Sequence, residues 1–160
     1  MTGHCSVLTT VTTRGTDCGI DDAALEAKLR DAGLRATRQR MALGRLLFSG
    51  PNHHISADEL HKKAIAAHHH LTLATVYNTL NQFCEAGLLR QVMASGSATY
   101  FDTDTSDHHH YFVENEGTVM DVPAGSVRFG LIPEPPEGMT VTHVDVIVHL
   151  RRKTPTDDQS

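Results

Sequence analysis

The chain has 160 residues, which is enough to bury a hydrophobic core in one or two small domains. No apolar run approaches the roughly 20 residues that cross a bilayer, and the first residues lack the basic patch and apolar stretch of a secretory signal, so we expect a cytoplasmic protein. The net charge of −5 is concentrated in the second half: residues 94–150 carry one basic and nine acidic side chains, which argues against nucleic-acid binding there and allows cation binding.

The first predicted elements are an N-terminal arm and two helices. Residues 1–20 are rich in Thr, Ser and Gly without periodicity, and we expect a mobile arm. Helical spacing predicts a helix that ends at Gly33 and a second one that Thr37 caps and that ends at Gly50. The stretch from Gly33 has four arginines and no acidic residue, a pattern typical of phosphate binding, although a solvated helix face has the same composition. These arginines are Arg35, Arg38, Arg40 and Arg45.

Two further helices are predicted after these. Ser56 and Glu59 have the spacing of a capping box, and the helix that they begin should run to about Ala67. The next helix, from about Thr72 to Ala86, has an apolar face formed by Leu73, Val76, Leu80, Phe83 and Cys84. Its opposite face carries uncharged groups that can approach base edges, namely Thr75, Asn78 and Gln82, with Tyr77 on the flank.

A hairpin follows the helices. Residues 88–93 and 98–101 alternate apolar and polar side chains around a turn at Ser95 and Gly96. Short helices followed by a hairpin predict a winged helix-turn-helix over residues 21–103, whose recognition helix contains Tyr77. A helical bundle that binds other proteins is the alternative.

The remainder of the chain is predicted to form strands. Residues 111–113 and 118–120 are two short strands, and a longer one alternates through Val144, Val146, Val148 and Leu150. A central strand between them is excluded by Pro133, Pro135 and Pro136. We therefore predict an α+β fold in which residues 104–153 form a small C-terminal α/β dimerisation domain, with a sheet shared across a two-fold axis and a disordered tail over residues 154–160.

Histidine is unusually frequent. The twelve histidines include the runs His53-His54, His68 to His70 and His108 to His110. Imidazoles together with carboxylates suit a divalent metal that must bind reversibly, although a histidine run can also be a solvated loop. For His68 to His70, at a predicted helix end without companion carboxylates, the solvated interpretation is preferred.

Several spaced blocks of the sequence resemble the ferric uptake regulator family. Residues 73–88 resemble its recognition helix, and the His108 to His110 run lies where the family has its sensor motif. Upstream blocks at residues 32–40 and 52–57 fit as well, so the resemblance covers roughly residues 22–152. Further blocks resemble the iron response regulator branch of the family, at residues 37–43, 100–103 and 151–153.

The resemblance implies a homodimeric, iron-responsive transcriptional regulator rather than an enzyme. Such a protein binds inverted-repeat double-stranded DNA through its winged helices and joins through its C-terminal sheet. The DNA contacts that the resemblance implies are Arg35, Arg40 and Tyr77, and the arginine cluster and the polar face of the predicted recognition helix add Arg38, Thr75 and Asn78. Asn78 departs from the arginine that is common at this position, and asparagine favours adenine edges where arginine favours guanine or phosphate.

The resemblance also implies a sensory site for Fe²⁺ or Mn²⁺, which Zn²⁺ could fill in vitro. The implied ligands are His54, Asp102, His108, His110 and Asp121. Because they come from both halves, metal binding would fix the angle between the halves. The branch often senses haem, which His108, His109 and His110 could bind axially. His109, out of phase with its neighbours, would point to the other face and could serve a second site.

The positions of the cysteines narrow these expectations, and other classes of protein remain as alternatives. The cysteine pairs that hold structural zinc in many relatives are absent, so we predict no thiolate zinc site. Cys18 lies where some haem-sensing members have a Cys-Pro motif, but Gly19 follows it. A peroxide-sensing regulator of the same family is one alternative, and a small histidine-rich metalloenzyme or a metal store are others. An enzyme would need a general base and a nucleophile motif that the sequence does not show.

Overall fold

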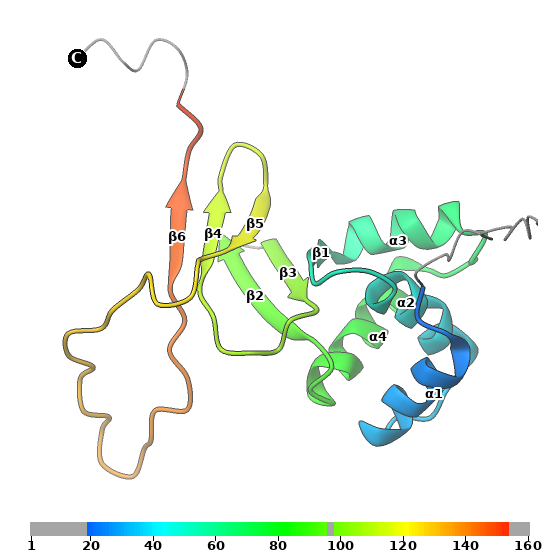
Figure 1. The fold of residues 1–160 in the computed structure, drawn as a ribbon, viewed down its shortest axis with the longest axis horizontal. Coiled ribbons are helices and arrows are strands. Elements are labelled where there is room, and N and C mark those ends of the chain that lie inside the picture. The colour runs from blue at the N-terminus through cyan, green and yellow to red at the C-terminus, as the bar shows by residue number, and fades with distance from the viewer. Residues whose placement is uncertain (1–18, 96–97, 154–160) are drawn as a thin grey trace, which may run out of the picture.

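The computed structural model describes residues 19–95 and 98–153 of the chain. The predicted arm up to Cys18, the Gly96 position of the predicted turn and the predicted tail over residues 154–160 lie outside them. Four helices occupy one end of the molecule and two small sheets lie beside them (Figure 1). The elements are α1 (Asp22–Asp31), α2 (Arg38–Phe48), β1 (His54–Ser56), α3 (Ala57–Ala66), α4 (Leu73–Glu85), β2 (Arg90–Ser95), β3 (Ala98–Asp102), β4 (His110–Val113), β5 (Thr118–Asp121) and β6 (Ile147–Leu150). No described helix is both long and apolar enough to cross a membrane.

Each helix in the described part of the chain begins at a side chain that caps it. The capping box predicted at the start of α3 is complete, because Ser56 accepts from the Glu59 amide and Glu59 accepts from the Ser56 amide at 2.9 Å. Gly33 and Gly87 follow α1 and α4 with φ of +74° and +71°, a conformation that favours glycine. The capping residues, each accepting from the backbone amide three positions later, are Asp21, Thr37, Ser56 and Thr72.

The apolar face predicted for α4 packs into the core of the helical half. Val76, Leu80 and Phe83 are fully buried, and Leu73 and Cys84 are half-buried against the same cluster. Burial of a side chain of this size contributes roughly 1.5–3 kcal/mol, so this face fixes the rotation of α4 and leaves the opposite face to solvent. Other members of the cluster are Leu25, Leu29, Leu43, Leu47, Leu60 and Phe101.

The strands form two three-stranded sheets. The first has the order β1-β3-β2 and is antiparallel, and its β2–β3 hairpin is the wing that follows α4. The second has the order β5-β4-β6, in which β4 pairs antiparallel with β5 and parallel with β6. The three-residue β1 strand is absent from the sequence predictions, because its residues are too few to show an alternation.

The wing packs against the second sheet through a small apolar cluster. Val92 and Ala94 of β2 are buried against Phe112 and Val119, with Ile147 at the edge. The packing joins the helical half to the C-terminal strands.

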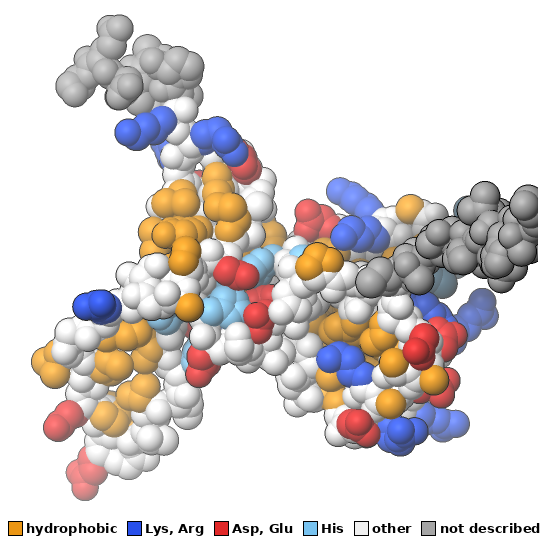
Figure 2. All heavy atoms as spheres, in the orientation of Figure 1, with side chains coloured by type: hydrophobic (Ala, Val, Ile, Leu, Met, Phe, Trp, Pro, Cys, Tyr) orange, Lys and Arg blue, Asp and Glu red, His pale blue; other side chains and the backbone are white. Residues whose placement is uncertain are grey.

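The C-terminal part is more open than the sequence predicts. The long strand expected over 144–150 is confined to Ile147–Leu150, because β6 pairs with β4, which is itself only four residues long. Residues 122–146 form neither helix nor strand and hold the exposed Leu131, Met139 and Val141. Figure 2 shows hydrophobic side chains gathered over this loop and over the strands above it.

Candidate metal centre and nucleic-acid interface

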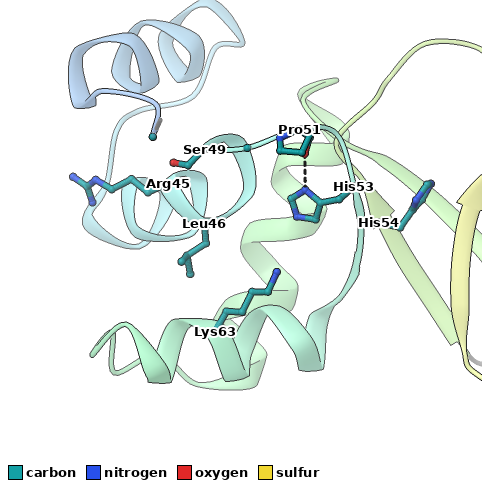
Figure 3. A pocket seen from close by; sticks show the side chains of 9 residues that line it. Arg45, Leu46, Ser49, Pro51, His53, His54 and Lys63 are labelled. Carbon is teal, nitrogen blue, oxygen red and sulfur yellow. Dashed lines mark hydrogen bonds between the residues drawn. The ribbon is translucent and has the colours of Figure 1, made fainter. Parts of the chain in front are cut away.

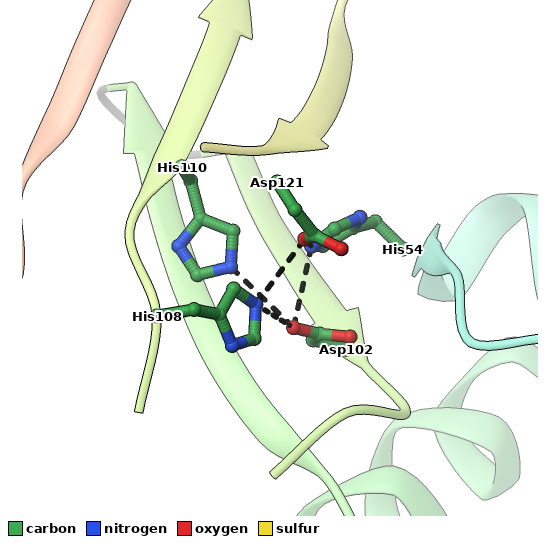
Figure 4. A group of neighbouring side chains, drawn as sticks. All are labelled: His54, Asp102, His108, His110 and Asp121. Atoms are coloured by element: carbon green, nitrogen blue, oxygen red, sulfur yellow. Dashed lines mark hydrogen bonds and ion pairs between the residues drawn. The ribbon is translucent and has the colours of Figure 1, made fainter. Parts of the chain in front are cut away.

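All five side chains implied as metal ligands come together between the two sheets. One potential ligand atom from each lies within 4.8 Å of every other (Figure 4). His54 and Asp102 are contributed by the first sheet, and the others come from the second sheet and the residues just before it. The complete group is His54, Asp102, His108, His110 and Asp121.

Strand register explains why these residues meet. His54 of β1 lies directly opposite Asp102 of β3, and His110 of β4 lies directly opposite Asp121 of β5. Each sheet therefore presents an imidazole and a carboxylate as a cross-strand pair. His108 precedes His110 by two positions, so its side chain lies on the same face.

One carboxylate lies at the centre of the group. Asp102 Oδ2 is 2.9 Å from His108 Nε2, 3.3 Å from His54 Nε2 and 3.4 Å from His110 Nε2. Asp121 Oδ1 closes the opposite side at 3.2 Å from both His54 Nε2 and His108 Nε2. Asp102 and His110 are 1% exposed, whereas the Asp121 side chain is 52% exposed, so the site opens to solvent on the Asp121 side.

The protonation and hydrogen bonding of the group fit a cation. Burial by itself raises the pKa of Asp102, but the adjacent imidazoles of His110 and His54 and the hydrogen bond from the Asp104 amide outweigh it and hold that pKa well below its ordinary range. Nε2 of His54 and of His108 is buried near carboxylates without making a hydrogen bond of acceptable geometry to the described residues. Buried unpaired nitrogens aimed at a shared space, together with an ionised carboxylate, are what a borderline divalent metal requires.

The middle histidine of the run, His109, is not part of this group. The ring of His109 packs edge-on against Phe129 with centroids 5.5 Å apart, as its out-of-phase position predicts. His108 and His110 turn toward Asp102 instead. The structure therefore does not bring His108, His109 and His110 to one face, as a haem site built on all three would require.

Arg90, which no sequence motif singles out, stabilises the segment that carries His108. Its guanidinium donates to the carbonyls of Ser106 at 3.0 Å and His108 at 3.4 Å, and it also contacts Asp145 and His143. Asp145 follows Arg90 by 55 positions, so no local pattern could pair them. Through these contacts β2 of the wing holds the backbone of His108, one of the five candidate ligands.

The residues implied in DNA contact lie on and around the outward face of α4. Tyr77 is 40% exposed, Asn78 is exposed and Thr75 is half-buried. Thr75 and Asn78 border a hollow of about 260 Å³ whose lining is Thr37, Gln39, Arg40, Thr75, Asn78, Thr79 and Gln82.

The four arginines near α2 have different surroundings. Arg35 and Arg38 are exposed. Arg40 donates to Gln82 Oε1 at 3.0 and 3.1 Å and to the Arg35 carbonyl at 2.8 Å, so part of its donor capacity joins α2 to α4. Arg45 is paired with Asp22 at 2.7 Å, so part of its donor capacity joins α2 to α1.

A larger hollow of about 830 Å³ lies on the helical side of His54 (Figure 3). His53 Nδ1 donates to the Pro51 carbonyl at 3.1 Å at its edge, and the lining includes Arg45 and Lys63 but no carboxylate. The His54 ring turns away from this space toward the sheets (Figure 3). The hollow therefore lacks the acidic ligands of the five-residue group.

Comparisons with known proteins agree with this architecture. A model described as "Ferric uptake regulator family" matches residues 31–146. The ferric uptake regulation protein of Vibrio cholerae is 40% identical over 85 residues, which cover 53% of this chain and 57% of that protein. The peroxide-responsive repressor of Staphylococcus epidermidis is 35% identical over 95 residues, or 59% and 63% of the two chains. The matched segment thus spans less than two thirds of these relatives.

Solved structures extend the likeness to most of the fold. The ferric uptake regulator of Pseudomonas aeruginosa with manganese has a TM-score of 0.60 at 25% identity, covering 81% of this chain and 98% of that one. The Vibrio cholerae ferric uptake regulator has a TM-score of 0.62 at 26% identity, covering 79% and 98%. The α+β fold with an N-terminal winged helix is therefore confirmed.

Proposed function

Because the chain belongs to the ferric uptake regulator family, we propose that it is a cytoplasmic, iron-responsive transcriptional regulator that binds palindromic operator DNA as a homodimer. The observation that carries this proposal is the five-residue group, whose ligands are shared between the winged-helix half and the C-terminal strands. The relatives that match are named as regulators, which favours this class over a metalloenzyme or a metal store.

Metal binding at this group would couple the metal concentration to the orientation of the DNA-binding half. His54 and Asp102 belong to the proposed winged-helix domain over 21–103, whereas His108, His110 and Asp121 belong to the proposed dimerisation domain over 104–153. A divalent ion would neutralise the carboxylates and draw the ligands of both domains to one point. The angle between the domains is then fixed, which selects one spacing of the two recognition helices in a dimer.

We place the DNA contacts on α4 and on the start of α2. Tyr77 and Asn78 are exposed on the outward face of α4, where an aromatic ring can meet thymine methyls and an amide can pair with adenine. We expect Arg35 and Arg38 to contact phosphates. The N–H groups of Arg40 that do not donate to Gln82 or to the Arg35 carbonyl can contact phosphates as well.

We place the dimer contact on the C-terminal strands and the long loop. β6 is an edge strand that pairs with β4 alone among the described strands. The neighbouring loop exposes Leu131 to 90%, Met139 to 67% and Val141 to 47%. A second copy of the chain would cover these apolar side chains across a two-fold axis.

The donor set of three imidazoles and two carboxylates suits Fe²⁺ or Mn²⁺, and Zn²⁺ as a substitute in vitro. Haem, which the resemblance also implies, would need histidines that already belong to this site. His108 and His110 would have to leave Asp102 before they could bind haem iron, so haem and the divalent metal are expected to compete. Haem binding would then leave the angle between the two domains free, whereas the divalent metal fixes it.

A DNA-binding titration tests the proposed function. A palindromic AT-rich operator and a scrambled duplex are titrated at fixed salt with metal-free protein, with Mn²⁺ or Fe²⁺, and with haem. We expect a preference for the operator that metal alters and that haem opposes. Weak binding that ignores sequence under all three conditions would overturn the proposal.

Peroxide sensing is a second candidate, because repressors named as peroxide-responsive are among the relatives at 35% identity. The chain is loaded with Fe²⁺, exposed to hydrogen peroxide and analysed by peptide mass spectrometry, with Mn²⁺-loaded protein as the control. Addition of one oxygen atom to His54, His108 or His110 only in the iron-loaded sample would support it. Unmodified histidines together with intact operator binding would exclude it.

A further inference from the structure

The turn between α3 and α4 holds a histidine in a strained backbone conformation. His68 has φ of +59° and is the one described residue other than glycine with a positive φ. The turn ends α3 through hydrogen bonds from the His68 amide to the Ile65 carbonyl at 3.0 Å and from the His69 amide to the Ala64 carbonyl at 2.9 Å. This helix-ending motif ordinarily has glycine at the left-handed position. Helix termination alone therefore does not explain an imidazole there.

The three histidines of this turn line a hollow with the start of α2. The hollow measures about 290 Å³, and all its polar side chains are imidazoles, a guanidinium or an amide. No carboxylate is among its lining residues, which are Arg38, Gln39, Ala42, His68, His69, His70 and Leu71. A concave surface of donors with a fixed positive charge suits an oxyanion.

A metal ion fits this hollow less well than an anion. Within the described part of the chain, the group of ligand atoms that converges for a metal is the one around Asp102, and it includes none of these three histidines. The neighbouring His61 is engaged through Nε2 at 2.9 Å from the Leu71 carbonyl, which fixes the turn to α3 and leaves the other imidazoles to the hollow.

The position of the hollow identifies the oxyanion. Gln39 lines both this hollow and the one that borders the outward face of α4, so the two are parts of a single surface. The cap of α4, Thr72, follows His70 and Leu71 directly, which places the histidines at the N-terminal end of the recognition helix. A DNA strand that borders α4 in the major groove carries a phosphate about every 3.4 Å along the helix axis, so its backbone must pass the helix ends.

We propose that the hollow formed by His68, His69, His70, Arg38 and Gln39 binds a phosphate of the operator backbone. This inference rests on the proposed DNA-binding function and adds a contact to it. The contact positions the recognition helix and carries no base preference, because every nucleotide presents the same phosphate. It gives a role to the one histidine run that the metal centre leaves unused.

Operator titrations of single variants test the contact. His69→Ala and His70→Ala should each weaken operator binding about threefold to tenfold, as the loss of one hydrogen bond does. Arg38→Gln should weaken binding to operator and scrambled duplexes alike and reduce the salt dependence by about one phosphate equivalent. Arg30→Gln, on α1 and outside the lining of both hollows, is the matched control and should bind as wild type.

His68→Gly separates a binding role from a structural one. Glycine accepts the φ of +59° without strain, so this variant should melt at the same or a higher temperature while binding DNA more weakly. If it binds the operator as tightly as wild type, His68 serves only to end α3 and does not contact phosphate.

Duplexes in which one phosphate is neutral locate the contact. A parallel titration distinguishes a DNA phosphate from free phosphate. Duplexes with a single methylphosphonate should reveal a position at which neutralisation weakens wild type but not His69→Ala. Inorganic phosphate is titrated in parallel into DNA-free protein and followed by the histidine ring resonances. Saturable phosphate binding with unchanged operator affinity of the variants would assign the hollow to free oxyanions and overturn the DNA contact. Variants equal to wild type in both titrations would overturn it altogether, whereas a wild type without operator preference would reject the proposed function itself.

Discussion

Two adjacent histidines offer the sharpest test of the metal centre. His110 is 1% exposed with Nε2 3.4 Å from Asp102, whereas His109 faces Phe129. We expect His110→Gln to abolish most of the stabilisation that Mn²⁺ gives to the fold and His109→Gln to leave it unchanged. Glutamine approximates the volume of histidine in both variants, so packing alone does not distinguish them.

The size of the effect follows from ligand linkage. At a Mn²⁺ concentration one hundred times its Kd, binding stabilises the wild type by about 2.7 kcal/mol. Loss of an outer partner of a metal ligand commonly weakens binding 10–100-fold, and loss of a ligand should do at least as much. At 100-fold weaker affinity the same Mn²⁺ concentration gives only about 0.4 kcal/mol.

Thermal unfolding with and without Mn²⁺ measures this difference. For a chain of this length, 1 kcal/mol corresponds to roughly 2–4 °C in Tm, so the wild type and His109→Gln should gain about 5–10 °C and His110→Gln about 1 °C. Each variant is compared with its own metal-free sample, which removes any effect on the apo fold. Equal gains for all three proteins would refute the assignment of His110 as a ligand.

Four other residues give independent tests. Tyr77→Ala should lower operator affinity at least tenfold with unchanged Tm and unchanged dimerisation, and dissociation of the dimer would show that its ring is structural. Arg90→Lys should weaken Mn²⁺ binding roughly tenfold, because an ammonium cannot make the several fixed contacts of the guanidinium; calorimetric titration giving wild-type affinity would contradict this. Burial and, secondarily, Glu85 raise the pKa of the Cys84 thiol to about 11, so alkylation of its peptide at pH 8 should be slow until the chain is unfolded, and immediate labelling would disprove it. Gly44→Ala should lower the free energy of unfolding by about 1–3 kcal/mol, because its Cβ would lie 2.9 Å from a Leu25 methyl, and an unchanged denaturation midpoint would show that Leu25 can move.

The helical half follows closely from its sequence, because its signals are local. The cap at Thr37, the capping box at Ser56 and the left-handed Gly87 each depend on neighbours within a few positions. Thr79 of α4 is buried although it is polar and does not belong to the apolar face that the sequence predicts. Its hydroxyl donates to the Thr75 carbonyl at 2.9 Å, so a polar residue joins the apolar face without an unpaired group.

The metal group was predicted from resemblance, and its geometry could not come from local patterns. His54 and Asp102 face each other only because β1 pairs with β3, and β1 is too short to show a strand period. The Arg90 contacts with Ser106 and Asp145 likewise depend on the packing of the wing against the second sheet. The extent of β6 was overestimated because the valine alternation says nothing about the length of its partner, β4.

The pairing of β1 with β3 also determines when in folding the metal can act. His54 reaches Asp102 only after α3, α4 and the wing have been placed, and Asp121 arrives with yet another strand. An ion that needs all these elements cannot stabilise a transition state in which they are still apart. It therefore lengthens the lifetime of the native chain by slowing its unfolding and leaves the refolding rate nearly unchanged. Under the proposed function, metal supply would then set the survival of the protein against proteolysis, in addition to its occupancy of DNA.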